Sequence, residues 1–132
     1  MPDVVAPDPA RLLPESPEPF VPEAASERIR IDAIEGVAMS APVELRRCIV
    51  TPSMSMVEVR WSKGAASRPH VHADHDSVVY VVSGRLRVTM AGETVIAGPG
   101  DSLASPPGVE HGIEALEDSV SIEVKSPPVR TW

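Results

Sequence analysis

The chain has 132 residues, which suits one small domain with a single core. Acidic residues outnumber basic ones by 19 to 12, and the formal charge of −7 argues against nucleic acid or an anionic membrane surface as the main partner. The single cysteine excludes an internal disulfide, and no segment approaches the roughly 20 apolar residues of a membrane-spanning helix.

Proline dominates the first part of the chain. Seven of the fifteen prolines lie within residues 1–22, mixed with Asp and Glu. Proline removes a backbone donor and opposes both helices and central strands. We therefore expect residues 1–25 to form a flexible, polyproline-like arm that is poorly ordered or draped over the domain or a partner subunit. Because this N-terminus lacks the basic start and continuous apolar run of a secretory signal, we expect a cytoplasmic protein.

From residue 26 onward the sequence changes to short strand patterns separated by turns. Period-two alternation or short β-branched runs occur in "RIRIDAI", "VELRRCIV", "SMVEVRWS", "SVVYVVS", "GRLRVTM", "ETVIA" and "SVSIEVK". The dipeptide Ala91-Gly92 and the cluster Gly98–Asp101 mark turns. No window shows a helix with caps. Many short strands at regular spacing predict an all-β sandwich or barrel for residues 26–132.

Three of the four histidines lie within six residues, at positions 70, 72 and 75. In a strand, residues i and i+2 project from the same face, so we expect His70 and His72 to lie side by side. Imidazole is a common metal ligand, and two adjacent rings need a third ligand from another strand. The remaining histidine, His111, follows a turn rich in proline and glycine, "SPPGVEH". These three residues are the candidate metal ligands.

The spacing around these histidines resembles that of the cupins, small β-barrels with a metal in the barrel mouth. The family's first motif places a glycine, two histidines, a glutamate and a glycine at intervals that here fall on Gly64, His70, His72, Ser77 and Gly84. Its second motif falls on Gly100, Pro106, Gly108 and His111. The resemblance covers about residues 54–126 and implies a small single-domain cupin β-barrel of jelly-roll type. It also implies one divalent metal ion, a small-molecule substrate and a homodimer that covers sheet edges.

The sequence departs from the family at two positions. Ser77 stands where the family has its glutamate ligand, and Ala115 where it has an asparagine. A hydroxyl is a poor ligand compared with a carboxylate, so the site holds three histidines or is completed by Asp76 or His75. Strict alternation along the strand places Asp76 inward, whereas counting back from Gly84 selects Ser77, and the choice stays open. Fe, Mn, Ni, Cu and Zn all remain candidates for the metal.

The C-terminal stretch "ALEDSVSIEVKSPPVRTW" resembles the end of the pectin-degradation cupins, which linearise unsaturated uronate sugars. The resemblance implies proton transfer by Glu123 and binding of the substrate carboxylate by Arg130, which lies one residue later than the pattern because Val129 intervenes. The competing interpretations are a solvent-facing glutamate on an edge strand and a free tail arginine. Tyr80 is a further catalytic candidate, although apolar residues share its face and packing explains it as well.

Three functions compete. The first is a metal-dependent enzyme of isomerase or lyase type that acts on a small oxygenated substrate, such as a sugar acid or a keto/enol compound. The second is a three-histidine Fe(II) dioxygenase or a polyketide-cyclase-like cupin, which oxygen uptake would distinguish. The third is a non-enzymatic cupin that binds a small ligand and returns it unchanged.

Overall fold

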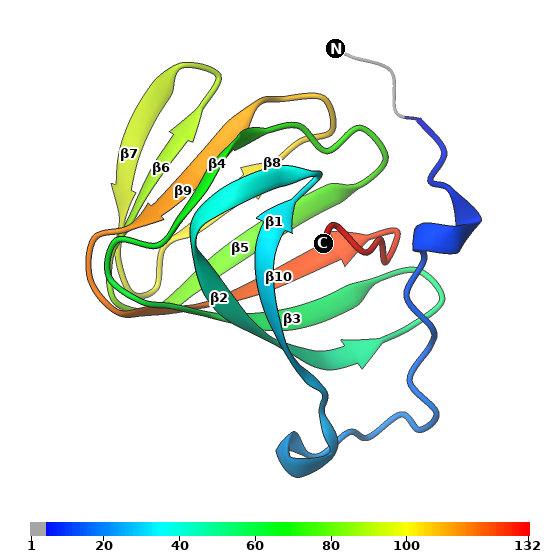
Figure 1. Ribbon diagram of the computed structural model, residues 1–132. Helices are drawn as coiled ribbons and strands as arrows, with labels where there is room; N and C mark the ends of the chain where they lie inside the picture. The colour runs from blue at the N-terminus through cyan, green and yellow to red at the C-terminus, as the bar shows by residue number, and fades with distance from the viewer. Residues whose placement is uncertain (1–4) are drawn as a thin grey trace.

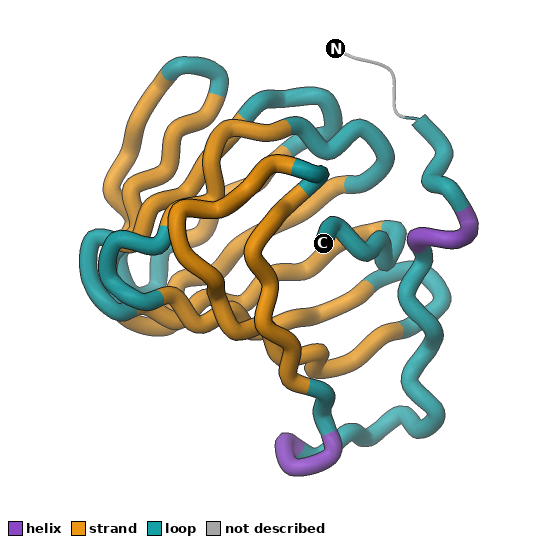
Figure 2. Tube along the Cα trace, viewed as in Figure 1, coloured by secondary structure: helices purple, strands orange, loops and turns teal. Residues whose placement is uncertain are grey.

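The computed structural model describes residues 5–132, and from Arg28 onward the chain folds almost entirely into strands (Figure 1). Ten strands occur in the described residues: β1 (Arg28–Ile34), β2 (Val37–Val50), β3 (Ser55–Trp61), β4 (Ala66–His70), β5 (Asp76–Ser83), β6 (Leu86–Met90), β7 (Glu93–Ala97), β8 (Ser102–Ser105), β9 (His111–Ala115) and β10 (Ser119–Ser126). Two single-turn 3₁₀ helices, η1 (Pro9–Arg11) and η2 (Glu23–Ala25), precede them (Figure 2). No helix among residues 5–132 is long and apolar enough to cross a membrane.

The strands form two antiparallel sheets. One has six strands in the order β1-β2-β3-β10-β5-β8, and the other has four in the order β4-β9-β6-β7. The chain crosses between the sheets several times, so strands that are distant in sequence become neighbours, as β3 and β10 do. The predicted all-β barrel of jelly-roll type is confirmed.

Alternation along the strands fills the space between the sheets with apolar side chains. In β3, for example, Val57, Val59 and Trp61 are buried, whereas the residues between them are more exposed. The buried apolar cluster comprises Ile31, Val43, Leu45, Val57, Val59, Trp61, Ala65, Val81, Leu86, Val88, Ala97 and Ala115. Burial of this apolar surface is the main favourable contribution to folding.

Strand β10 has the opposite polarity from an ordinary barrel strand. Its buried residues include Ser121 and Lys125, and its outward face carries the apolar Val120, Ile122 and Val124. The interpretation of this segment as an edge strand is wrong, because β10 pairs with β3 on one side and β5 on the other. One part of the barrel interior is therefore polar.

Three strands carry no clear sequence pattern. Strand β4 reads "ASRPH", and its proline is tolerated because β4 lies at the edge of its sheet. Strands β8 and β9 have only four and five residues, with little alternation. They are ordered by pairing with longer neighbours, β8 with β5 and β9 with both β4 and β6. Strand β2 also begins at Val37, earlier than its apolar pattern indicates.

The described part of the proline-rich arm lies along one side of the barrel (Figure 1). Backbone hydrogen bonds hold it there, from Leu13 N to Pro128 O at 2.8 Å and from Ser16 N to Val50 O at 3.0 Å. The Leu13 side chain is buried. Residues 1–4 of the predicted arm lie outside the described residues, and the flexibility of the arm and its boundary at residue 25 stay predictions.

Gly84, in the turn between β5 and β6, occupies a position where a larger residue should destabilise the fold. Its φ is +85°, and a Cβ added there would lie 2.5 Å from Asp118 O and 2.6 Å from Ser119 Cα. Gly92 has a similar φ of +81° but open space around it. We expect Gly84→Ala to lower the free energy of unfolding by about 3 kcal/mol or more, and Gly92→Ala by only about 1 kcal/mol. Urea denaturation measures both, and equal losses would contradict the steric argument.

Candidate metal centre

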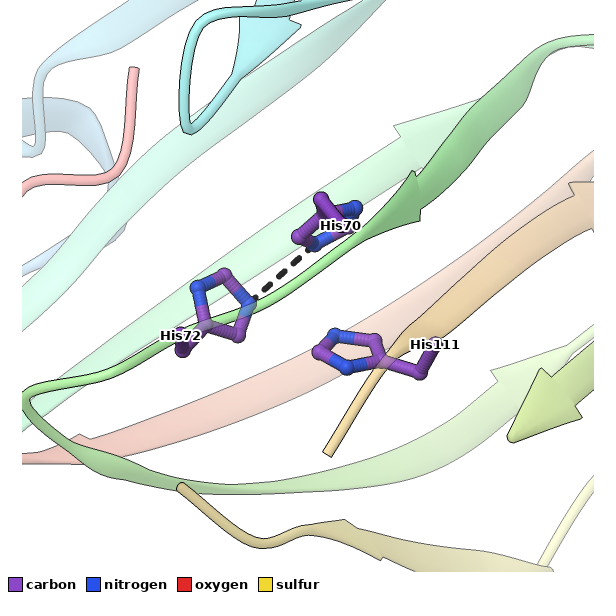
Figure 3. A group of neighbouring side chains, drawn as sticks. All are labelled: His70, His72 and His111. Carbon is purple, nitrogen blue, oxygen red and sulfur yellow. Dashed lines mark hydrogen bonds between the residues drawn. The ribbon is translucent and has the colours of Figure 1, made fainter. Parts of the chain in front are cut away.

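Three histidines from two strands and a loop converge inside the barrel. His70 ends β4, His72 lies two residues later in the loop before β5, and His111 begins β9. Strands β4 and β9 are paired, and His70 lies opposite His111 in this pairing. The backbone hydrogen bonds of the two strands therefore bring these two histidines together. All three side chains are buried. Figure 3 shows their rings facing one another.

The rings of this three-histidine group (His70, His72 and His111) lie close enough to share one ion. Their centroids are 4.7 Å apart for His70 and His72, 4.5 Å for His70 and His111, and 4.8 Å for His72 and His111. One nitrogen from each ring lies within 4.8 Å of the other two. The sequence prediction that these three residues gather at one point agrees with this geometry.

Each ring has an oxygen acceptor at Nδ1. For His70 and His111 it is the carbonyl oxygen two residues earlier, at 2.7 and 3.1 Å. For His72 it is Glu35 Oε1, at 3.3 Å. Because an acceptor at Nδ1 fixes the proton there, the lone pair of each ring is left on Nε2. This is the arrangement in which metal-ligating histidines are oriented by their other nitrogen.

The distance between two of these nitrogens fits a bound metal ion. Nε2 of His70 and Nε2 of His72 lie 3.2 Å apart. With both protons on Nδ1, two lone pairs face each other, which is repulsive unless a cation lies between them. A metal bound at about 2.1 Å from each nitrogen holds two such atoms about 3.0–3.4 Å apart. The three-histidine group therefore fits a divalent metal ion.

Burial favours the neutral form, which is the form that binds metal, in His70 and His72. Burial is the main cause that lowers the pKa of His70 and of His72 below the usual value of 6.5. For His72, the charges that neighbouring rings would carry lower the pKa further. Neutral imidazole is the ligand form, so both rings are ready to bind metal at neutral pH.

The fourth position of the family motif holds no carboxylate. Asp76 is exposed, and Ser77 is buried on the inner face of β5. Of the two counts between which the sequence left the choice open, the one that places Asp76 inward is wrong, because residues 71–75 leave the strand geometry and alternation does not continue through a loop. Within residues 5–132, no Asp, Glu, Cys or further histidine joins the three-histidine group.

His75 supports the group from the side. Its ring is fully buried, and its centroid lies 4.5 Å from that of His72. Nδ1 of His75 lies 2.7 Å from Asp74 Oδ1, while Nε2 has no hydrogen-bond partner among the described residues. Burial lowers the pKa of His75 despite the nearby carboxylate. The ring therefore packs against His72 as a neutral group.

The three-histidine group lines a small cavity between the sheets. Its volume is about 40 Å³, which leaves room for an ion and a few water molecules. Glu123 and Lys125 of β10 line the same cavity. The remaining wall is largely apolar and includes Ile34 and Met39 from the β1–β2 hairpin.

Lys125 is a cation at this cavity that sequence reasoning missed. Its side chain is buried, and Nζ donates a hydrogen bond to Thr131 Oγ1 at 3.0 Å. Nζ also lies 3.7 Å from Glu123 Oε1 and 5.6 Å from the centre of the Trp132 ring. Alternation in "SIEVK" would have placed Lys125 on the same face as Glu123. The missing information was that this polar face points inward.

Two predicted catalytic side chains do not line the cavity, and their catalytic roles stay predictions. Tyr80 is 48% exposed on the outward face of β5, because alternation places it opposite the buried Val79 and Val81. Arg130 is exposed, because the preceding residue, Val129, is the one that turns inward and is fully buried. Of the predicted catalytic residues, only Glu123 lines the cavity with the histidines.

Comparison with known proteins agrees with this geometry. The family model for the cupin domain matches residues 57–124. The chain is 38% identical over 86 residues to the pectin degradation protein KdgF of Dickeya dadantii (strain 3937), an alignment that covers 63% of this chain and 78% of that protein.

Two solved structures extend the comparison. KdgF from Halomonas sp. matches with a TM-score of 0.63 and 37% identity, covering 64% of this chain and 78% of that one. An RmlC-like cupin from Shewanella frigidimarina NCIMB 400 matches with a TM-score of 0.71 and 27% identity, covering 86% and 93%. The structural matches support the cupin fold. The matches to the two KdgF proteins support the resemblance to pectin-degradation cupins.

The site predicts one bound metal ion per chain. We expect purified, untagged protein to hold about one divalent transition-metal ion per chain, measured by inductively coupled plasma mass spectrometry. His72→Ala and His111→Ala should each lose it, because two imidazoles are left. Asp76→Ala should retain it, because that carboxylate is exposed. Loss of metal in Asp76→Ala, or its retention in both histidine variants, would contradict this ligand set.

The lowered histidine pKa values predict how the metal-free protein responds to pH. Below about pH 6.5 the histidines of the unfolded chain take up protons that buried His70, His72 and His75 resist. The unfolded state then binds more protons, so the free energy of unfolding falls as pH falls, by up to about 1.4 kcal/mol per pH unit for each ring. Urea denaturation in chelator at pH 7.5, 6.5 and 5.5 checks this, and an unchanged midpoint across that range would refute it.

Proposed function

Because this chain belongs to the cupin family, we propose that it is a metal-dependent enzyme of isomerase or lyase type acting on a small sugar acid, with an unsaturated uronate as the substrate class. One observation carries the proposal: a carboxylate, Glu123, and an ammonium, Lys125, line the same cavity as the three-histidine group. Similarity to pectin degradation proteins KdgF supports the choice of substrate class.

The residues divide the chemistry between them. The three-histidine group would hold the metal, which when bound supplies a Lewis acid that polarises a substrate oxygen. Converting an enol-type sugar into a keto form requires a proton to move between oxygen and carbon. Glu123 is the cavity carboxylate that can accept and return this proton. The buried, largely apolar wall limits competing proton exchange with water.

Lys125 takes the role of substrate anchor in this proposal. A uronate carries one carboxylate, and a buried ammonium is a strong hydrogen-bond donor to it. Lys125 Nζ is held in place by Thr131 Oγ1, yet an ammonium has three donors, so further donors remain for a ligand. The Glu123 carboxylate, 3.7 Å away, is then free to act on the reacting part of the sugar.

The cavity is too small for the proposed substrate, so the enzyme would have to open before the substrate binds. A volume of about 40 Å³ does not admit a sugar acid, so part of the wall must move. The β1–β2 hairpin and the C-terminal tail contribute Ile34 and Thr131 to the wall. They are joined by a hydrogen bond from Glu35 N to Thr131 O at 2.7 Å. Movement of the hairpin tip away from the tail would open the site, as lids do in other enzymes.

The experiment is a turnover assay on an unsaturated uronate, followed by the loss of ultraviolet absorbance of its conjugated double bond. Metal-loaded wild-type protein should consume the substrate without consuming oxygen. Glu123→Gln should lower kcat by about 10²- to 10⁴-fold, because general acid–base catalysis contributes a factor of that size. Oxygen uptake with a phenolic or diketone substrate would favour the dioxygenase, and a ligand bound but returned unchanged would favour the non-enzymatic cupin.

A matched pair of variants tests the anchor. Lys125→Met should lower kcat/KM by about 10- to 100-fold, the loss expected for one charged hydrogen bond. It should have little effect on the methyl ester of the same substrate, which carries no carboxylate charge. Arg130→Ala is the control, because that side chain is exposed, and it should leave kcat/KM unchanged. Equal losses on acid and ester would assign Lys125 to packing alone.

A further inference from the structure

The proline-rich arm contributes a side chain to the surroundings of the metal centre. Arg11 is the last residue of η1, and its guanidinium bridges two carboxylates. Nη2 lies 2.6 Å from Glu35 Oε1, and Nη1 lies 3.0 Å from Asp74 Oδ2. Glu35 is at the tip of the β1–β2 hairpin, and Asp74 is in the loop between β4 and β5. One arginine therefore joins three separate segments of the chain.

The arm backbone holds Arg11 in this position. Arg130 N donates to Arg11 O at 2.7 Å, and Arg11 Nε donates to Arg130 O at 3.2 Å. The next residue, Leu12, forms an isolated antiparallel bridge with Val129. The arm and the C-terminal tail thus form a short paired segment beside the hairpin tip. Hydrogen bonds to the Arg130 backbone and ion pairs with two carboxylates together fix the direction of the guanidinium.

Both carboxylates are connected to His72, Glu35 directly and Asp74 through His75. Glu35 Oε1, which Arg11 contacts, is also the acceptor 3.3 Å from His72 Nδ1. Asp74 holds His75 through Oδ1 at 2.7 Å, and the His75 ring lies against His72. Glu35 orients the His72 ring from its Nδ1 edge, and Asp74 does so through the packed His75 ring. Arg11 contacts both of these carboxylates.

Charge explains why the bridge is needed. The side chains of Glu35 and Asp74 are only 17% and 8% exposed, so each carboxylate requires a partner. Without Arg11, two poorly solvated negative charges would lie close together with no cation between them. Each carboxylate would then gain by turning toward water and away from its histidine. A planar guanidinium, which binds two carboxylates at once, suits this position better than an ammonium.

We propose that Arg11 is a positioning residue for the metal centre, which makes the N-terminal arm part of the site. Acting through Glu35 and Asp74, it holds His72 with the proton on Nδ1 and the Nε2 lone pair directed at the metal. Both Arg11 and Glu35 lie outside the cupin-domain match at residues 57–124. The inference rests on the metal site of the proposed function and not on its reaction or substrate.

The first measurement is metal affinity. Titration of chelator-treated full-length protein with Co(II), followed by calorimetry and by the visible spectrum, should show binding about 10- to 100-fold weaker in Arg11→Ala than in the wild type, the loss typical when a ligand loses its outer hydrogen-bond partner. The control is Arg28→Ala. Arg28 also bridges two carboxylates, of Glu23 and Glu44 at 3.0 and 2.9 Å, but on the exposed surface away from the histidines. The Arg28→Ala variant should bind Co(II) as tightly as the wild type does.

The second measurement does not depend on metal. Two-bond ¹⁵N–¹H correlation spectra of metal-free protein report which nitrogen of His72 carries the proton. We expect the Nδ1–H form in the wild type and in Arg28→Ala, and loss of that preference in Arg11→Ala. If Arg11→Ala does not fold, Arg11→Lys takes its place; one ammonium replaces the double bridge, and a several-fold loss of Co(II) affinity is expected.

The outcomes separate the two proposals. Wild-type Co(II) affinity together with an unchanged His72 tautomer in the Arg11 variant would overturn the positioning role and leave the metal site intact. A wild-type protein that binds no Co(II) would instead contradict the proposed function. In that case the His72 tautomer alone decides for or against Arg11.

Discussion

The structure depends on the burial of three imidazoles, of which His70 and His72 have a pKa that burial lowers and Nε2 atoms that face each other. A buried polar group needs a partner, and the Nδ1 atoms of the three-histidine group have theirs in two carbonyl oxygens and a carboxylate. The Nε2 atoms of His70 and His72 face each other at 3.2 Å, a spacing that fits two ligands of one metal ion. A metal ion bound there would stabilise the folded chain, because binding to the folded state couples metal affinity to stability.

The part of the barrel interior next to the histidines is polar. An ordinary barrel strand turns its apolar face inward, but β10 turns Glu123 and Lys125 toward the cavity and Val120, Ile122 and Val124 outward. The apolar residues of β3 on the same inner surface belong to the core, so the interior is divided into an apolar part that holds the sheets together and a polar part beside the three-histidine group. A fold of this kind can change its substrate by changing a few inward positions on β10 without disturbing the core.

Three segments outside the cupin-domain match at residues 57–124 contribute side chains around the three-histidine group and its cavity. The hairpin tip supplies Glu35, the C-terminal tail supplies Thr131, and the arm supplies Arg11. The hairpin and the C-terminal tail also line the cavity, through Ile34 and Thr131. Under the proposed route of entry, movement of the hairpin tip would also disturb the contacts of Glu35 with His72 and with Arg11 of the arm.

The sequence by itself determined the all-β class, most of the strands and the three histidines, because alternation and motif spacing are local properties of a chain. It also identified Glu123, through a resemblance. Only the tertiary structure decided which of Asp76 and Ser77 faces inward, because the loop at residues 71–75 breaks the alternation. It likewise decided that Lys125 rather than Arg130 lies at the cavity, and that Arg11 reaches Glu35 and Asp74. Alternation tells which residues share a face, but which face is inside, and which distant segments meet there, depends on how the sheets close around the site.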